Sequence, residues 1–261
     1  MRLSACPAMV RAHDPDRFLT AIFAPPEQRE ALFVLYAFNH ELARAREVAS
    51  QPVIGLMRLQ WWREVVEGAE RRHEVASPLS ALIAEGRLRR EDLLAMIDAR
   101  EAEVDEAFET VEAWRAYLRG SAGGLAVTAG RMLGADQWTC QQLEALGAAY
   151  GVAGLLRNVG AHARQGRCLL PADVLAAAGL DVHAVIAGQG GAALRRVVRE
   201  LAAEGQALLA EGGGAMAKSV LAAGLPAVLA RRDLRNIENA PRERGFGDRW
   251  AVARAWMIGW V

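Results

Sequence analysis

Cysteine is scarce in this chain, whose 261 residues include only Cys6, Cys140 and Cys168. The three lie far apart in no metal-binding spacing, and an odd number of thiols cannot pair completely. A disulfide framework or a cysteine zinc site is therefore not expected. We predict free thiols and a reducing compartment.

An excess of one charge is also lacking, because 31 Lys and Arg balance 31 Asp and Glu. A neutral chain gives no electrostatic reason to expect nucleic acid as a partner. Long hydrophobic runs are missing too. The uncharged run at residues 219–230, one of the longest, is far shorter than the roughly 20 residues of a membrane span, and Pro226 interrupts it. We expect a cytoplasmic protein, soluble or at most peripheral on a membrane.

Runs of β-branched residues are scarce, and apolar residues recur every three or four positions, which predicts helices throughout. Asp14 followed by Pro15 is typical of an N-cap and first helical residue. The main expected helices span residues 15–23, 26–49, 91–109, 111–133, 136–165 and 192–209, with another beginning at residue 52. We predict one all-α domain over residues 14–261, preceded by a disordered leader of residues 1–13.

The most informative stretch is a glycine-lined helix that leads into a polar cluster. Gly147, Gly151 and Gly154 lie close to one helical face, and Asn158 falls within roughly 20° of Gly147. His162 follows near the same face. Each helical glycine costs up to about 1 kcal/mol relative to alanine, so this face needs a packing or binding reason. Close helix packing is the favoured reason, and contact with a ligand is the alternative.

The polar cluster carries a family motif. The stretch from Arg157 to Pro171 resembles R-D-V-G-E-D-A-R-R-G-R-x-Y-L-P, the second signature of the squalene/phytoene synthase family. The identical positions are Arg157, Val159, Gly160, Ala163, Arg164, Gly166, Arg167, Leu170 and Pro171. A Tyr-Ala-Phe run at residues 36–38 also precedes the place of the family's D-D-x-x-D motif. This resemblance, over about residues 14–240, implies an isoprenoid-synthase-type helical bundle with a central cavity.

The resemblance implies a reaction that joins two prenyl diphosphates with magnesium, yet most of the required acids are missing. The first motif would fall on Ala43, Arg44 and Glu47, and the second has Asn158 and His162 in place of aspartates. Mg²⁺ needs carboxylate and phosphate oxygens to neutralise a departing diphosphate. We therefore predict no catalytic residues and no cofactor, with magnesium only if the chain is an active enzyme.

An anionic ligand remains possible without metal, because guanidinium groups bind phosphate directly. The resemblance implies that the motif arginines gather around the cavity mouth. The predicted ligand-binding residues are Tyr36, His40, Arg44, Arg46, Gly151, Gly154, Arg157, Asn158, His162, Arg164 and Arg167. A prenyl diphosphate or an anionic lipid would suit them. Two alternatives stay open: Asn158 and His162 could satisfy each other, or His40, Glu47 and His162 could hold zinc.

Two functions follow from these residues. The first is a divergent, non-catalytic family member, since the strips at residues 36–43 and 54–62 look most like the branch that assists assembly of respiratory complex I. Subunits of that complex would then be partners. The alternative is an active magnesium-dependent prenyltransferase that makes squalene or phytoene, with Glu41 and Glu47 as spare acids.

Two charged or aromatic stretches stand outside these motifs. The acids Glu101, Glu103, Asp105, Glu106 and Glu109 are expected to form a solvated face. Near the C-terminus, Trp250, Trp256 and Trp260 are expected in a helix that closes the bundle. The alternative is a docking tip at a membrane interface, which tryptophan favours.

Overall fold

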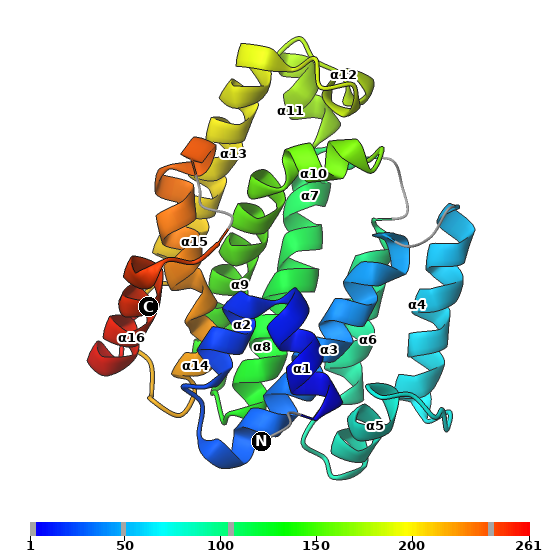
Figure 1. Cartoon of the computed structure of the whole chain (residues 1–261), viewed down its shortest axis with the longest axis vertical. Helices are drawn as coiled ribbons and strands as arrows, with labels where there is room; N and C mark the ends of the chain where they lie inside the picture. Colours follow the sequence, from blue (N-terminus) through cyan, green and yellow to red (C-terminus); the bar gives the residue numbers. More distant parts are fainter. Residues whose placement is uncertain (1–3, 48–50, 104–106, 240–242) are drawn as a thin grey trace.

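The computed structural model describes residues 4–47, 51–103, 107–239 and 243–261, and all regular elements in these ranges are helical (Figure 1). Two isolated β-bridges, Phe108 with Pro171 and Ala215 with Trp260, are the other main-chain pairings of note. The all-α prediction is confirmed.

The elements are α1 (Ala5–His13), α2 (Pro15–Ala21), α3 (Pro26–Glu47), α4 (Pro52–Glu67), α5 (Ala76–Ala84), α6 (Arg90–Glu101), α7 (Val111–Leu118), the π-helical turn η1 (Arg119–Gly123), α8 (Gly124–Met132), α9 (Gln137–Arg157), α10 (Val159–Arg164), α11 (Ala172–Ala177), α12 (Val182–Ile186), α13 (Gly191–Gly212), α14 (Leu221–Gly224), α15 (Pro226–Arg235), the 3₁₀ turn η2 (Ile237–Asn239) and α16 (Phe246–Ile258).

Helix α9 is the centre of the bundle and packs against α8, η1, α13 and α15 (Figure 1). Its glycines explain the close approach to η1. A Cβ at Gly147 would lie 2.5 Å from the carbonyl oxygen of Ala122, and one at Gly151 would lie 2.8 Å from Leu118. The preference for helix packing over ligand contact is therefore right for these two positions.

The expectation of a disordered segment over residues 1–13 is wrong for residues 5–13, which form α1. This helix packs on α3 and buries Cys6 and Val10. The predicted cap that follows is confirmed, because Asp14 Oδ1 accepts a hydrogen bond from the Arg17 amide at 3.1 Å. The short apolar face of α1 was too weak a signal to separate a packed helix from a tail.

Two expected helices are interrupted. The acidic helix ends at Glu101 and is followed by a turn that contains Glu103, while Asp105 and Glu106 lie outside the described residues. The helix expected over 136–165 breaks at Asn158, whose φ of −104° and ψ of 10° are not helical. The chain therefore changes direction at the polar cluster, at the junction of α9 and α10.

The last helix, α16, returns to pack on α15 (Figure 1). Its C-terminal end is fixed by main-chain bonds between Val261 and Gly214 and between Met216 and Gly259. No helix in the described ranges combines the length and the apolar character needed to cross a bilayer. All three cysteines are buried and free, as predicted.

Candidate functional site

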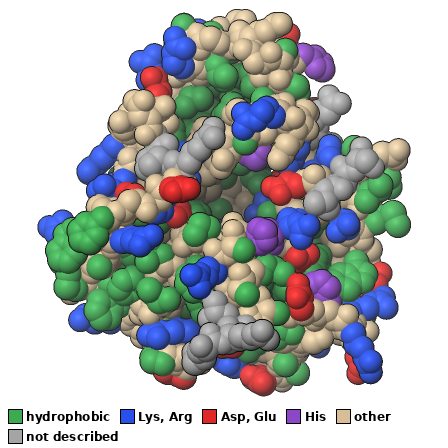
Figure 2. Space-filling model, viewed as in Figure 1, with side chains coloured by type: hydrophobic (Ala, Val, Ile, Leu, Met, Phe, Trp, Pro, Cys, Tyr) green, Lys and Arg blue, Asp and Glu red, His purple; other side chains and the backbone are tan. Residues whose placement is uncertain are grey.

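A cavity of about 440 Å³ opens between the α1–α2 junction, α3, the end of α6, η1, α9 and α10. Figure 2 shows this face of the molecule hollowed near its centre, with acidic, basic and histidine side chains around the rim. The lining combines apolar groups such as Leu118 and Leu155 with titratable ones. Its titratable residues are His13, Asp14, Arg17, His40, Glu47, Arg100, Glu103, Tyr117, Tyr150, His162 and Arg167.

A buried cluster around Glu103 is the strongest electrostatic feature of the cavity. Glu103 is 4% exposed and accepts hydrogen bonds from Arg100 and Tyr117, and from Arg167 Nη2 at 3.1 Å. Arg100 also donates to the amide oxygen of Asn39 at 3.3 Å. Burial opposes ionisation of Glu103, but the two guanidinium groups and the phenol hold the pKa of its carboxyl below its usual range.

The expectation that Glu103 belongs to a solvated acidic face is therefore wrong. The neighbouring acidic residues suggested a solvated position for Glu103. Its partners Arg167 and Tyr117 lie 64 and 14 positions away in the chain, so no local pattern indicated these contacts. One available signal was the spacing to Arg100, since residues three apart are neighbours on a helix.

Two histidines that line the cavity, His40 and His162, have lowered pKa values. His40 stacks on His13 with ring centroids 4.4 Å apart and 8° between planes. Burial and the nearby His13 and Arg44 lower the pKa of His40 to about 4. Burial and Arg167 likewise lower the pKa of His162. His40 Nε2 and His162 Nδ1 are both buried and find no hydrogen-bond partner among the described residues.

The structure brings eight of the sequence-predicted residues to this cavity. They are His40, Ala43, Glu47, Gly151, Gly154, Asn158, His162 and Arg167. Asn158 does not pair with His162, because its side-chain amide donates to the carbonyl oxygen of Gly154 at 2.9 Å. At Gly154 an added Cβ would meet nothing within 4 Å, so this glycine borders open space rather than a helix.

The other predicted residues do not line the cavity. Tyr36 is 2% exposed and lies beneath the Arg17 guanidinium, Arg44 pairs with Glu41 at 3.7 Å, and Arg157 pairs with Asp233 at 2.8 Å. Arg164 is exposed on α10, and Arg46 is half-buried on α3. The expected gathering of motif arginines is thus corrected: Arg167 enters the cavity, and Arg100 and Arg17, which sequence analysis missed, join it.

The residues at the family's metal positions do not suit magnesium. Ala43 has no ligand atom, Asn158 offers one neutral amide oxygen rather than a carboxylate, and His162 offers nitrogen rather than oxygen. Glu47 remains, and burial together with the negative charge of Glu103 raises the pKa of its carboxyl. The zinc alternative also lacks support, because the described residues contain no group of three or more His, Cys, Asp or Glu that could hold an ion.

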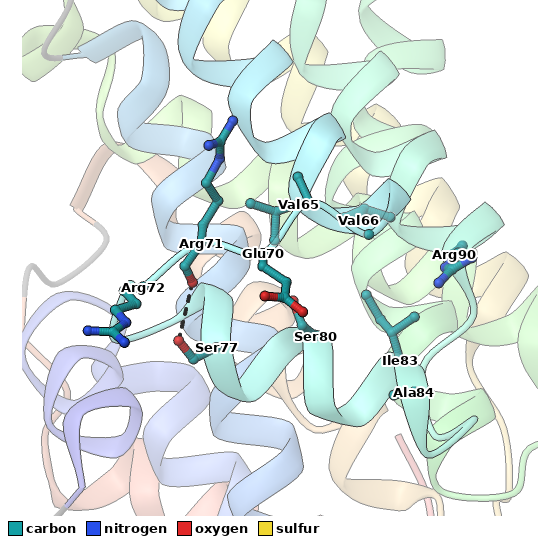
Figure 3. A pocket seen from close by; sticks show the side chains of 12 residues that line it. Val65, Val66, Glu70, Arg71, Arg72, Ser77, Ser80, Ile83, Ala84 and Arg90 are labelled. Atoms are coloured by element: carbon teal, nitrogen blue, oxygen red, sulfur yellow. Dashed lines mark hydrogen bonds between the residues drawn. The ribbon is translucent and has the colours of Figure 1, made fainter.

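A second hollow of about 490 Å³ lies between the end of α4 and α5, and it contains none of the predicted site residues. Three arginines border it, but Figure 3 shows that Arg71, Arg72 and Arg90 point in three different directions. Arg71 is paired with Glu64 at 3.0 Å, and its carbonyl accepts from the Ser77 hydroxyl at 3.3 Å. The cationic groups do not converge, so the central cavity is the better candidate site.

Solved structures with the same fold include two that are described as synthases. A dehydrosqualene synthase crystallised with ligand superposes with a TM-score of 0.78 at 15% identity, covering 97% of this chain and 94% of that one. Squalene synthase HpnC from Alicyclobacillus acidocaldarius gives a TM-score of 0.67 at 21% identity, covering 97% and 92%. At these identities the likeness shows the fold alone.

Curated proteins that are similar in sequence are described as assembly factors rather than as synthases. "NADH dehydrogenase (ubiquinone) complex I, assembly factor 6" from Homo sapiens is 26% identical over 205 residues, which are 76% of this chain and 62% of that protein. The Drosophila melanogaster homolog is 28% identical over 196 residues, covering 69% and 58%. The chain thus spans about three fifths of the length of these relatives. Residues 10–256 match the profile of squalene/phytoene synthase, and the chain belongs to that family.

Proposed function

We propose that this chain is a divergent, non-catalytic family member that binds an anionic ligand with an apolar tail and assists assembly of respiratory complex I. The observation that carries the proposal is the occupancy of the metal positions by Ala43, Asn158 and His162. Without paired carboxylates at these positions, the chain lacks the ligands with which the family's motifs would assemble magnesium ions to neutralise a departing diphosphate.

The composition of the cavity supports a ligand that is polar at one end. Arg100 and Arg167 enter it with Glu103, and His40 Nε2 and His162 Nδ1 have no protein partner among the described residues. A phosphate or diphosphate headgroup can accept from guanidinium and imidazole N–H groups. Leu118, Leu155 and the open face at Gly154 can contact the tail. A prenyl diphosphate and an anionic phospholipid share this chemistry.

The assembly role is supported by the relatives described as complex I assembly factor 6, which match 76% of this chain in the human case. By this proposal the partners are subunits of the respiratory complex. The protein would then act in the cytoplasm or peripherally at the inner face of the membrane that carries the complex.

The competing proposal, an active prenyltransferase, needs replacement acids. Glu41 was one spare, but it lines a separate apolar recess with Trp61 and Met57, and its carboxylate lies 3.7 Å from Arg44. Only Glu47 of the two spares borders the central cavity. The geometry therefore favours the non-catalytic proposal.

Catalysis is tested by incubating the protein with farnesyl or geranylgeranyl diphosphate and Mg²⁺ and measuring pyrophosphate release. We expect no release above the protein-free control, and turnover would overturn the non-catalytic assignment. The companion variant Ala43→Asp/Asn158→Asp/His162→Asp restores the missing acids. Turnover in this variant alone would show that the loss of carboxylates is what abolished activity.

Ligand binding is tested by thermal shift with prenyl diphosphates and with short-chain phosphatidylglycerol, each with and without EDTA. We expect stabilisation that EDTA does not remove. Gly154→Leu should abolish the shift by filling the cavity, whereas Gln141→Leu, an exposed position on the same helix, should retain it. No shift with any compound would contradict ligand binding.

The assembly role is tested by deleting the gene in its host and measuring assembled complex I on native gels together with NADH oxidation by membranes. We expect both to fall and to recover with the wild-type gene. Normal complex I in the deletion strain would contradict the assembly role without bearing on ligand binding.

A further inference from the structure

Helix α16 presents a row of large apolar side chains to the outside of the molecule. Phe246, Trp250 and Met257 are 84%, 55% and 50% exposed, and at 100° per residue they fall within roughly 40° of each other. Ile258 and Trp260, at the C-terminal end of the helix and just beyond it, are also exposed, at 61% and 54%. Figure 2 shows this hydrophobic patch at the left edge of the molecule, where α16 lies in Figure 1.

The opposite face of α16 is fixed to the bundle, so the apolar row cannot turn inward. Val252 is fully buried, and the Trp256 ring packs on Phe23 with centroids 5.6 Å apart. Asp248 accepts hydrogen bonds from Arg232 Nε at 2.7 Å and from the Gly245 amide at 3.1 Å. The helix therefore both closes the bundle, as expected from sequence, and offers a rigid outer surface.

The charges beside the row are positive. Arg249 and Arg254 are exposed on α16, and Arg254 lies roughly 40° from Trp250 around the helix. The one acidic residue of α16 is Asp248, which is buried and paired with Arg232. The outer face of this helix thus combines aromatic groups and cations without an exposed carboxylate of its own.

A groove of about 860 Å³ borders the same side of the molecule. Arg249 and the 43% exposed Ile22 line it, as do Tyr150 and Asn158, which also line the central cavity. The surface around α16 is therefore continuous with the candidate ligand site. A lipid bilayer is the partner that could contact the apolar row and also lie next to the groove that leads to the central cavity.

We propose that α16 docks the protein on an anionic membrane surface. Phe246, Trp250 and Met257 enter the boundary between headgroups and acyl chains, and Arg249 and Arg254 contact lipid phosphates. A protein partner is the less suited occupant, because exposed aromatic side chains beside Arg249 and Arg254 match the negative potential and amphipathic depth of a bilayer interface. This docking is independent of the assembly role and of ligand binding in the cavity.

The test is co-sedimentation of the full chain with vesicles of phosphatidylcholine alone or with a third phosphatidylglycerol. We expect binding to the anionic vesicles that weakens with salt. Phe246→Ser/Trp250→Ser should reduce partitioning at least about tenfold, because each aromatic contributes more than about 1 kcal/mol of apolar burial. Arg249→Gln/Arg254→Gln should reduce it by about fivefold per charge and remove the preference for anionic lipid.

The matched control is Val53→Ser/Met57→Ser on α4. These side chains are 54% and 67% exposed, and Figure 1 places α4 on the opposite side of the molecule from α16. The control should bind like the wild type, and thermal unfolding should show that all variants fold. The proposal is overturned if the wild type does not bind anionic vesicles, if Phe246→Ser/Trp250→Ser binds normally, or if only the α4 variant loses binding.

Discussion

Arg167 Nη2 lies 3.1 Å from Glu103 Oε2, in an ion pair that joins the loop after α10 to the turn after α6 beneath the central cavity. Both residues are nearly inaccessible to solvent, at 8% and 4% exposed. An arginine of the family's second signature is thus partnered by a carboxylate outside both metal motifs. The polar floor of the cavity is held by the ion pairs of Glu103 with Arg100 and Arg167.

Glu103→Gln should destabilise the protein by about 3 kcal/mol, because it leaves Arg100 and Arg167 buried without a compensating charge. Urea unfolding measures the change. The control is Glu101→Gln, two residues away, whose exposed carboxylate pairs with Arg63 and should change stability by less than about 1 kcal/mol. Equal effects of the two substitutions would contradict the buried network.

Stability should fall as pH is lowered from about 7 to 4. The pKa of His40 is about 4 in the folded protein and near 6.5 when exposed, so over this window the unfolded chain takes up a proton that the folded chain does not. His162 acts in the same direction. We expect His40→Gln to lose less stability than the wild type between pH 7 and 4.5.

The control for the histidine effect is His183→Gln, at an exposed position on α12. It should keep the pH dependence of the wild type in the same unfolding measurements. An unchanged pH slope in His40→Gln would contradict the contribution of His40 to the acid sensitivity.

The glycines of α9 should respond in opposite directions to alanine. Gly147→Ala should destabilise by about 1–3 kcal/mol, because its Cβ would lie 2.5 Å from the Ala122 carbonyl oxygen. Gly154→Ala meets nothing within 4 Å and should stabilise by up to about 1 kcal/mol through helix propensity. Thermal or urea unfolding of the two variants measures these changes in stability. A loss of stability in Gly154→Ala would contradict the open space beside Gly154.

Asp233→Asn should destabilise by about 3 kcal/mol. Asp233 is 1% exposed and accepts from Arg157 at 2.8 Å and from Arg244 at 2.7 Å, and Arg244 also pairs with Asp16 at 2.7 Å. The substitution leaves an uncompensated positive charge in this cluster. Glu238→Gln, which removes an exposed pair with Arg199, should have little effect in the same assay.

The sequence by itself determined the helical class, several helix boundaries and the family. These follow from local rules: Asp14 caps α2, prolines open α3 and α4, and the spacing of Gly147 and Gly151 marks a close helix contact. The motif residues indicated the fold, because a family motif is recognised from the order of the residues alone. They also showed that the family's aspartates are missing.

Only the tertiary structure decided which side chains meet. Glu103 looked like part of a solvated acidic run until folding placed Arg167 beside it, and Arg157 looked like a ligand contact until Asp233 on α15 paired with it. Ion pairs between distant segments depend on how helices pack, which no local pattern encodes. The outward direction of the apolar row on α16 likewise depends on tertiary packing, because burial of Val252 and Asp248 against the bundle fixes which face of the helix points outward.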